Sequence, residues 1–447
     1  MPRFFDAPTS RDREPLLITG ARLLDPAATI DAVHDVLVDA KGVQIDPRDV
    51  PRAARRLDAA GLWLLPGLID LQVHFRQPGF EHKETLATGS RAALAGGVTT
   101  CVVMPNTKPS LDNAEAVRSQ GEEARRVGAV RILVAAAVTQ GLGGEAITDH
   151  GGLAAAGAVA VTDDGLPVMS AELMAQSLAA CAEHDLLFMQ HAEDISITHH
   201  RPMTEGPTSR ALGVEGQPAD AEGVMVERDV RLAREAGARY HVLHTSTARS
   251  VAAVREAKSA GAAVSCEASP HHLLLTDEAC ARAPGGDPNT KMNPPLRREA
   301  DRQALIAALA DGTVDAIATD HAPHAAEEKA KGFVDAPFGV IGLETAFATA
   351  LAFMHDKTID SRRAVELMTA GPARVLRQST RLGTLASDEA VSDLCLVDPE
   401  QRWTVGDDTL FGRSKNSAFG GHEFRGRVVA TVLDGALRYL TRESLLA

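Results

Sequence analysis

Short apolar segments alternate with segments of helical apolar spacing through the middle of the chain, and this alternation constrains the fold most. The apolar segments span residues 62–75, 99–106, 130–138, 157–164, 186–194, 239–247, 262–272 and 314–324. Helical spacing occurs between them at residues 84–97, 112–128, 170–185, 222–237 and 246–261, and several of these stretches end in Gly. Apolar strands joined by helices predict a parallel sheet that is buried on both faces.

The number of these units predicts an α/β fold built on a closed (β/α)8 barrel of the TIM type. Eight strand-like segments lie within roughly 250 residues, the usual size of such a barrel. The alternative is a doubly wound open sheet. The barrel is favoured because no G-x-G-x-x-G follows the first strand and because polar residues end one strand after another.

The two ends of the chain carry a different pattern. Residues 16–25 and 31–46 have the apolar and turn residues of short strands, and a similar pattern returns at 391–398 and 426–440. We expect the ends to pair into a small β-sandwich domain, formed by residues 1–65 and 378–447, beside a barrel of residues 66–377. The alternative is that the β-rich ends pack separately.

Composition narrows the class of partner. The 447 residues carry a formal net charge of -14 and only 4% are aromatic, which argues against nucleic acid and anionic membranes as partners. Five cysteines without a C-x-x-C pair argue against a disulfide framework. No run of about 18 apolar residues is present to span a bilayer. We therefore expect a cytoplasmic protein.

Polar residues gather at the carboxyl ends of the predicted strands. These ends are QVHFR (72–76), MPN (104–106), TDD (162–164), QHAED (190–194), LHTST (243–247), ASPHH (268–272) and TDHAPH (319–324). In a barrel they converge on one mouth. Imidazoles and carboxylates without thiolates suit zinc or a similar catalytic divalent ion. Asp320 follows the eighth strand and is placed to move protons beside a metal-activated water.

Several of these segments together resemble the bacterial-type dihydroorotases of the amidohydrolase superfamily. The resemblance runs from about Leu16 to Tyr439. It is carried by GLIDLQVHFRQPGFEHKET (67–85), MPNTKP (104–109), VTDDG (161–165), HAED (191–194), HTST (244–247), SPHHLLL (269–275), KMNPPLR (291–297), ATDHAPH (318–324) and APFGVIGLET (336–345). KMNPPLR with ATDHAPH and APFG is specific to the dihydroorotase branch.

The resemblance implies a pair of metal ions bridged by a carboxylate. One ion would lie between the first-strand positions Gln72 and His74 and Asp320, and the other at His191 and His244. Strand spacing alone leaves Asp163 and Asp164 open as the bridge, and the resemblance favours Asp164, with a capping role for Asp163. Substrate-binding positions are implied as well, at Arg76, Asn106, Asn293, His324, Phe338 and Gly339.

Gln72 departs from this pattern. Side chains at 72 and 74 of a strand share a face, so a metal site there calls for His at both positions. A neutral amide oxygen is a weak zinc ligand, whereas Asp164, His191 and His244 still provide three ligands and an open position. One tight ion, two unequal ions, or an inactive enzyme are the possible outcomes. We expect at least one zinc ion and retained catalysis.

The resemblance implies reversible cyclisation of N-carbamoyl-L-aspartate to L-dihydroorotate in pyrimidine biosynthesis. Hydantoinases and allantoinases are the nearest alternative, but they commonly use a carboxylated lysine on the fourth strand, where GAVAVTDDG (157–165) has none. A non-catalytic companion of aspartate carbamoyltransferase is a further alternative, and an active enzyme could also bind that partner. A homo-oligomer is expected. Residues 195–217 are either a lid or a solvated excursion.

Overall fold

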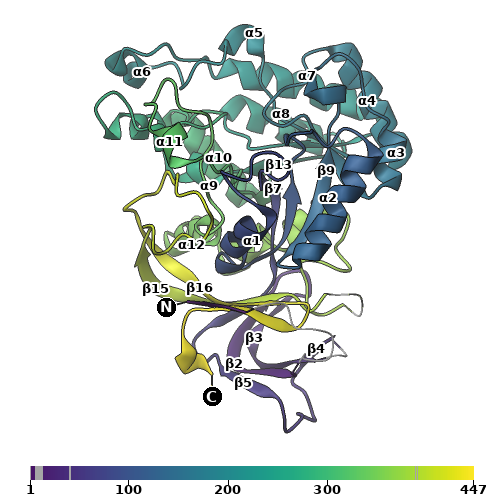
Figure 1. Cartoon of the computed structure of the whole chain (residues 1–447), viewed down its shortest axis with the longest axis vertical. Helices are drawn as coiled ribbons and strands as arrows, with labels where there is room; N and C mark the ends of the chain where they lie inside the picture. The colour runs from purple at the N-terminus through teal and green to yellow at the C-terminus, as the bar shows by residue number, and fades with distance from the viewer. Residues whose placement is uncertain (1, 6–13, 40–41, 388, 390, 447) are drawn as a thin grey trace.

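Eight parallel strands form a barrel in the computed structural model of the chain, which describes residues 2–5, 14–39, 42–387, 389 and 391–446 (Figure 1). The strands are β7 (Leu68–Val73), β8 (Val98–Val103), β9 (Arg131–Ala136), β10 (Ala158–Val161), β11 (Leu187–Gln190), β12 (Arg239–Val242), β13 (Val264–Ala268) and β14 (Ala316–Ile317). Each strand pairs in parallel with the next along the chain. Seven of them lie within the predicted apolar segments, and β8 begins one residue before its segment (99–106), so the barrel prediction is confirmed.

Helices pack around the outside of the strands and also lie beyond the ends of the barrel (Figure 1). They are α1 (Leu86–Ala95), α2 (Ala114–Val127), α3 (His150–Ala155), α4 (Ala171–His184), α5 (Ile195–Thr198), α6 (Pro207–Leu212), α7 (Asp220–Ala236), α8 (Ala248–Ser259), α9 (Pro270–Leu274), α10 (Glu299–Asp311), α11 (Ala326–Lys329), α12 (Ala346–His355), α13 (Ser361–Glu366) and α14 (Ala370–Val375), with 3-10 turns at Gln140–Leu142, Asp277–Arg282, Pro288–Thr290 and Glu443–Leu445. Local signals set their bounds. The Asn113 side chain accepts from the backbone N–H of Ala116 to start α2, and left-handed Gly128 ends it.

The barrel closes between its first and last strands, although β14 has only two residues. A parallel bridge joins Val73 to His321, and the N–H of His74 donates to the carbonyl of His321 at 2.8 Å. The buried Asp70 carboxylate supplements this short ladder, because it accepts the Thr319 hydroxyl at 2.6 Å and the Thr319 N–H at 3.1 Å. Burial raises the pKa of Asp70 to about 7.

Alternate strand residues build two apolar cores. On β11, Leu187 and Met189 belong to the cluster inside the barrel, whereas Phe188 belongs to the cluster between strands and helices. This alternation follows from the two-residue period of a strand. Ala373 of α14 and Leu382 in the segment that follows this helix join the inner cluster. Apolar side chains therefore fill one end of the barrel and leave the carboxyl ends of the strands for polar groups.

Both chain ends share one sheet of nine strands below the barrel (Figure 1). Its strands are β1 (Arg3–Phe4), β2 (Leu16–Asp25), β3 (Ile30–Asp39), β4 (Gly42–Ile45), β5 (Arg55–Asp58), β6 (Trp63–Pro66), β15 (Leu394–Thr404), β16 (Glu423–Leu433) and β17 (Ala436–Leu440). The predicted β-domain of paired ends is thus confirmed. Hydrogen bonds join all nine strands, and residues from both ends share one apolar core, for example Ile18 with Leu396.

The predicted strand segment 62–75 belongs to two units. Its first part is β6, which pairs with β15 and β2 of the lower sheet, and its second part is β7 of the barrel. Gly67 stands at the junction, where its N–H donates to the Asp393 carbonyl at 2.8 Å. An apolar run alone could not predict this division, because both parts are buried. The boundaries at 65/66 and 377/378 stay a prediction.

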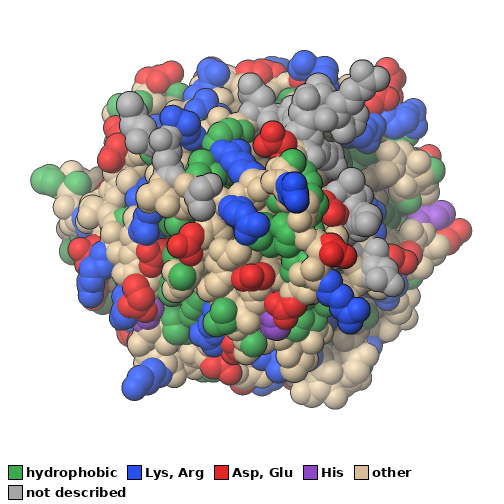
Figure 2. Space-filling model, turned by 90° about the horizontal axis from the view of Figure 1, so that it is seen from below, with side chains coloured by type: hydrophobic (Ala, Val, Ile, Leu, Met, Phe, Trp, Pro, Cys, Tyr) green, Lys and Arg blue, Asp and Glu red, His purple; other side chains and the backbone are tan. Residues whose placement is uncertain are grey.

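The surface and the helices bear on possible partners. Figure 2 shows the face that carries the lower sheet, and on it basic and acidic side chains are interspersed. None of the described helices combines the length and the apolar character needed to cross a bilayer. All five cysteines are buried and have free thiols. Within the predicted strand segment 31–46, residues 40 and 41 lie outside the described residues.

Gly67→Ala tests the junction between the two units. A Cβ at Gly67 would overlap the Thr99 side chain and lie 2.9 Å from the Cβ of Asp393. We expect the variant to lose ~1–3 kcal/mol of unfolding free energy, as in other overpacked sites. The control is Gly121→Ala in α2, where a Cβ would meet only an Arg125 side-chain nitrogen at 3.6 Å. Thermal melts measure the stability of both variants. An unchanged melting temperature for Gly67→Ala would contradict close packing around Gly67.

Candidate metal centre

The barrel brings together polar residues from five strand ends. Gln72 lies on β7 and His74 follows it, Asp164 follows β10, His191 follows β11, His244 follows β12, and Asp320 follows β14. All six side chains are buried. Two sets of three can each offer ligand atoms that lie within 4.8 Å of one another: Asp164 with His191 and His244, and His74 with Asp164 and Asp320. Asp164 belongs to both sets.

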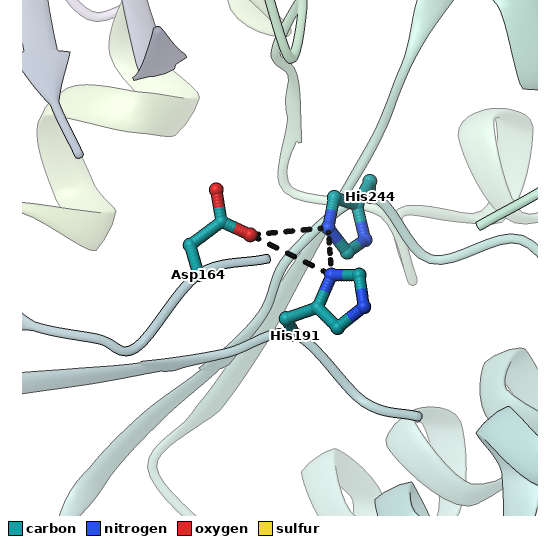
Figure 3. A group of neighbouring side chains, drawn as sticks. All are labelled: Asp164, His191 and His244. Carbon is teal, nitrogen blue, oxygen red and sulfur yellow. Dashed lines mark hydrogen bonds and ion pairs between the residues drawn. The ribbon is translucent and has the colours of Figure 1, made fainter. Parts of the chain in front are cut away.

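The first set points inward from three neighbouring strands (Figure 3). Nδ1 of His191 lies 3.0 Å from Nε2 of His244. Oδ1 of Asp164 lies 3.6 Å from the first of these nitrogens and 3.5 Å from the second. Two imidazoles and one carboxylate oxygen thus face a common point, and together they could hold a divalent ion with one position left open.

The second set meets around His74. Its Nε2 lies 3.1 Å from Oδ2 of Asp164 and 3.1 Å from Oδ1 of Asp320. Gln72 points into the same place, and its amide Nε2 donates to Oδ2 of Asp164 at 2.8 Å. Its Oε1 has no hydrogen-bond partner among the described residues. Gln72 therefore lies where sequence reasoning put a doubtful ligand, but it contacts the carboxylate as a donor.

The electrostatics favour a cation. Burial by itself lowers the pKa of an imidazole, yet hydrogen bonds to Asp164 and Glu193 raise the pKa of His191 to about 10, and Asp164 with Asp320 raises that of His74 to about 9. Burial raises the pKa of Asp164, but the surrounding imidazoles hold it well below its usual range. Carboxylates that stabilise protons on their neighbours so strongly would also attract a divalent ion.

Glu193 is a functional candidate that sequence reasoning missed. Its Oε2 lies 3.1 Å from Nε2 of His191 and accepts the Asn293 amide at 2.8 Å, and its Oε1 accepts the Thr198 hydroxyl. With Nε2 donating to Glu193, His191 turns Nδ1 toward Asp164, as a ligand imidazole requires. The signal was present in HAED, which places a carboxylate two residues after the imidazole, directly behind a strand, where side chains two residues apart share a face if the backbone stays extended.

Asn106 supports the ligands in a similar way. Its Oδ1 lies 2.9 Å from Nδ1 of His74, and its Nδ2 donates to the backbone carbonyl of Asp164 at 3.1 Å. This pair of bonds fixes the ring of His74 with Nε2 toward the two carboxylates. A contact between Asn106 and substrate stays a prediction, as does one for Asn293, whose amide donates to Glu193.

A second group of predicted residues surrounds Arg76. Its Nε donates to the Pro323 carbonyl at 3.2 Å, and one terminal nitrogen lies 3.4 Å from Nε2 of His324. His324 in turn lies 2.8 Å from the Phe338 carbonyl. Burial lowers the pKa of Arg76 to about 10, although Asp320 and Asp164 oppose this effect. The guanidinium therefore stays charged at neutral pH, close to the metal-ligand carboxylates.

Backbone conformation marks three of the predicted site residues. Arg76, His244 and Asp320 have positive φ angles of 59°, 29° and 48°. Residues with a Cβ rarely adopt this region, which costs on the order of 1–3 kcal/mol each. Such strain is typical of positions where the fold directs a side chain into a site.

Two uncertain features of the sequence have clear places in the structure. Asp163 points away from the cluster and caps the segment after β9, because its carboxylate accepts the N–H groups of Val138 and Thr139 at 2.8 and 3.0 Å. The capping prediction for Asp163 is thus confirmed. The excursion 195–217 is packed on the site's rim: Met203 is buried in one cluster with Met292, and Thr204 accepts from Arg297 at 3.4 Å.

Known proteins match this chain over nearly its full length. It is 44% identical to a dihydroorotase of Anaeromyxobacter dehalogenans strain 2CP-C over 424 residues, and this alignment covers 94% of this chain and 97% of the relative. The chain belongs to the dihydroorotase family. A dihydroorotase of Solibacter usitatus strain Ellin6076 is 43% identical over 432 residues, 96% of this chain and 99% of the relative. Residues 61–250 also match the family described as Dihydro-orotase-like.

Solved structures share the fold of this dihydroorotase-family chain. The L-hydantoinase (dihydropyrimidinase) from Arthrobacter aurescens superposes with a TM-score of 0.82 at 25% identity, over 94% of this chain and 95% of that one. A dihydropyrimidinase from Brevibacillus agri NCHU1002 gives a TM-score of 0.82 at 23% identity, over 95% and 94% of the two chains. The comparisons together support a hydrolase of cyclic amides.

Glu193→Gln tests the support of the metal ligands. The amide keeps the size of the side chain but accepts less strongly from Nε2 of His191, so we expect zinc affinity to fall ~10–100-fold. The control is Glu235→Gln on the exposed face of α7, which should bind zinc as the natural chain does. Competition with a zinc chelator measures both dissociation constants. Equal zinc affinities for the natural chain and Glu193→Gln would show that Glu193 does not orient His191 for metal binding.

Proposed function

We propose that this chain is a zinc-dependent dihydroorotase that interconverts N-carbamoyl-L-aspartate and L-dihydroorotate. The observation that carries the proposal is the convergence of Asp164, His191 and His244 at the mouth of the barrel. Membership of the dihydroorotase family supplies the substrate class. A zinc ion held by these three residues would polarise the ring amide carbonyl and supply a water of lowered pKa when bound.

Asp320 is proposed to move the proton. Its carboxylate is buried, lies 3.1 Å from Nε2 of His74, and follows the last strand on the same rim as the zinc ligands. In hydrolysis it takes a proton from the attacking water and delivers it to the ring nitrogen as the C–N bond breaks. In ring closure it takes that proton from the carbamoyl nitrogen and returns it to the departing oxygen.

Arg76 is proposed to bind the substrate carboxylate. Its Nε and one terminal nitrogen contact protein groups, and a charged guanidinium recognises carboxylates through paired donors. His324 supports it, since burial and Arg76 lower the pKa of His324 and keep its ring neutral. The backbone of Phe338 and Gly339 is proposed to line the pocket beside Arg76. It is fixed there by the Gly339 N–H, which donates to the Lys291 carbonyl at 3.0 Å. The local positive charge offsets the acidic surplus of the chain.

Turnover of a panel of substrates tests the activity. We expect hydrolysis of dihydroorotate and little or no hydrolysis of hydantoin or allantoin, because Arg76 provides a partner for a ring carboxylate that those compounds lack. A chelator should abolish the activity and added zinc should restore it. Turnover of hydantoin alone would assign a different substrate. A chain that binds no zinc and turns over none of the three compounds would instead favour a non-catalytic role beside aspartate carbamoyltransferase.

Asp320→Asn tests the proton transfer. The amide cannot accept a proton, so we expect turnover of dihydroorotate to fall ~10²–10⁴-fold while its KM changes only a few-fold. The control, Asp407→Asn, changes an exposed carboxylate in the connection between β15 and β16 and should leave both constants unaltered. Steady-state kinetics on both variants provide the measurement, and near-natural turnover by Asp320→Asn would exclude the assigned role.

A further inference from the structure

The two oxygens of Asp164 face different partners. Oδ1 faces the imidazoles of His191 and His244, at 3.6 and 3.5 Å. Oδ2 faces Nε2 of Gln72 at 2.8 Å and Nε2 of His74 at 3.1 Å. The first oxygen also accepts the N–H of Gly165 at 2.8 Å, and its remaining lone pair can serve an ion on the side of His191 and His244. The second oxygen already has a firm hydrogen bond from an amide.

A second ion would need that same Oδ2. The other candidate set consists of His74, Asp164 and Asp320, and a bridging Asp164 would offer it the oxygen that accepts from Gln72. Gln72 presents a positive N–H to this oxygen instead of a ligand lone pair, so a cation bound there would meet electrostatic repulsion at the position where the strand calls for a ligand. Gln72 has no exposed surface, so its side chain cannot move out into solvent.

The amide also cannot easily reverse to become a ligand. Without an ion between them, turning Oε1 toward Asp164 would place two acceptor-only oxygens at the distance of a hydrogen bond, and Nε2 would take the place of Oε1, which has no partner among the described residues. Even after such a reversal, a neutral amide oxygen is a weaker zinc ligand than the imidazole that the strand position calls for.

We propose that Gln72 makes this a mononuclear centre: its amide donates to Oδ2 of Asp164 in place of a second cation and confines the metal to Asp164, His191 and His244. This inference deepens the proposed function and rests on it for the presence of zinc. Asp320 and His74 then keep their contact with each other instead of ligating a second ion. The carboxylate proposed to move protons therefore does not share its charge with a metal.

Metal stoichiometry tests the role of Gln72. The natural chain and Gln72→His are loaded with excess zinc, passed through a desalting column, and measured for zinc per chain by elemental analysis. Calorimetric zinc titration gives the affinity of each site. The matched control is Gln190→His, since Gln190 is also buried on a barrel strand, donates to a carboxylate, that of Asp229, at 3.3 Å, and has an unpartnered Oε1. Circular dichroism reports the folding of each variant.

Gln72→His should bind two zinc ions, and the natural chain and Gln190→His one each. A second ion should bind the natural chain more weakly than Gln72→His by on the order of 100-fold or more. The loss of a hydrogen bond to a metal ligand alone lowers metal affinity ~10–100-fold, and here a ligand itself is absent. Manganese provides a readout on the natural chain itself. Its paramagnetic resonance spectrum should be that of an isolated ion, whereas Gln72→His should give the signal of a spin-coupled pair.

Two results would overturn the inference. One is a natural chain that binds two zinc ions with similar affinity or shows a coupled manganese pair. The other is a folded Gln72→His variant that still binds one. These results are separate from the substrate panel: a natural chain with one zinc that hydrolyses hydantoin instead of dihydroorotate would contradict the proposed activity and support the mononuclear centre.

Discussion

The contact between the first and last barrel strands is the constraint on which the rest of the site depends. It joins His74 to Asp320, which are 246 residues apart in sequence. The strand ladder there is short, and the buried Asp70 carboxylate holds Thr319, the residue before Asp320. A buried hydrogen bond to a carboxylate is strong enough to fix this closure and the left-handed backbone of Asp320 that follows it.

Asp164 is the second organising element, because both candidate ligand sets include it. Its side chain is held by imidazoles on one oxygen and by Gln72 on the other, while Asn106 binds its backbone carbonyl. Glu193 acts one layer further out by orienting His191. A carboxylate fixed from so many directions needs little rearrangement to bind a cation, which is how a preorganised site gains affinity.

Regular elements and most site positions could be predicted from the sequence, and supporting contacts could not. Apolar periodicity placed every barrel strand, because buried parallel strands leave a continuous apolar signal. It could not divide residues 62–75 between two units, since β6 and β7 are equally buried. Nor could it distinguish Asp163 from Asp164 without the family resemblance. Glu193 and Asn106 were placed beside the ligands only by side-chain directions, which depend on local backbone angles.

The sequence by itself determined the barrel, the β-domain made from both ends, and which imidazoles and carboxylates stand at the strand ends. It also showed that position 72 carries an amide where a metal site calls for an imidazole. Only the tertiary structure decided what that amide does. Whether Gln72 ligates a metal, donates a hydrogen bond or makes no polar contact depends on which Asp164 oxygen lies opposite its nitrogen. That position follows from strand register and barrel closure instead of from residue type.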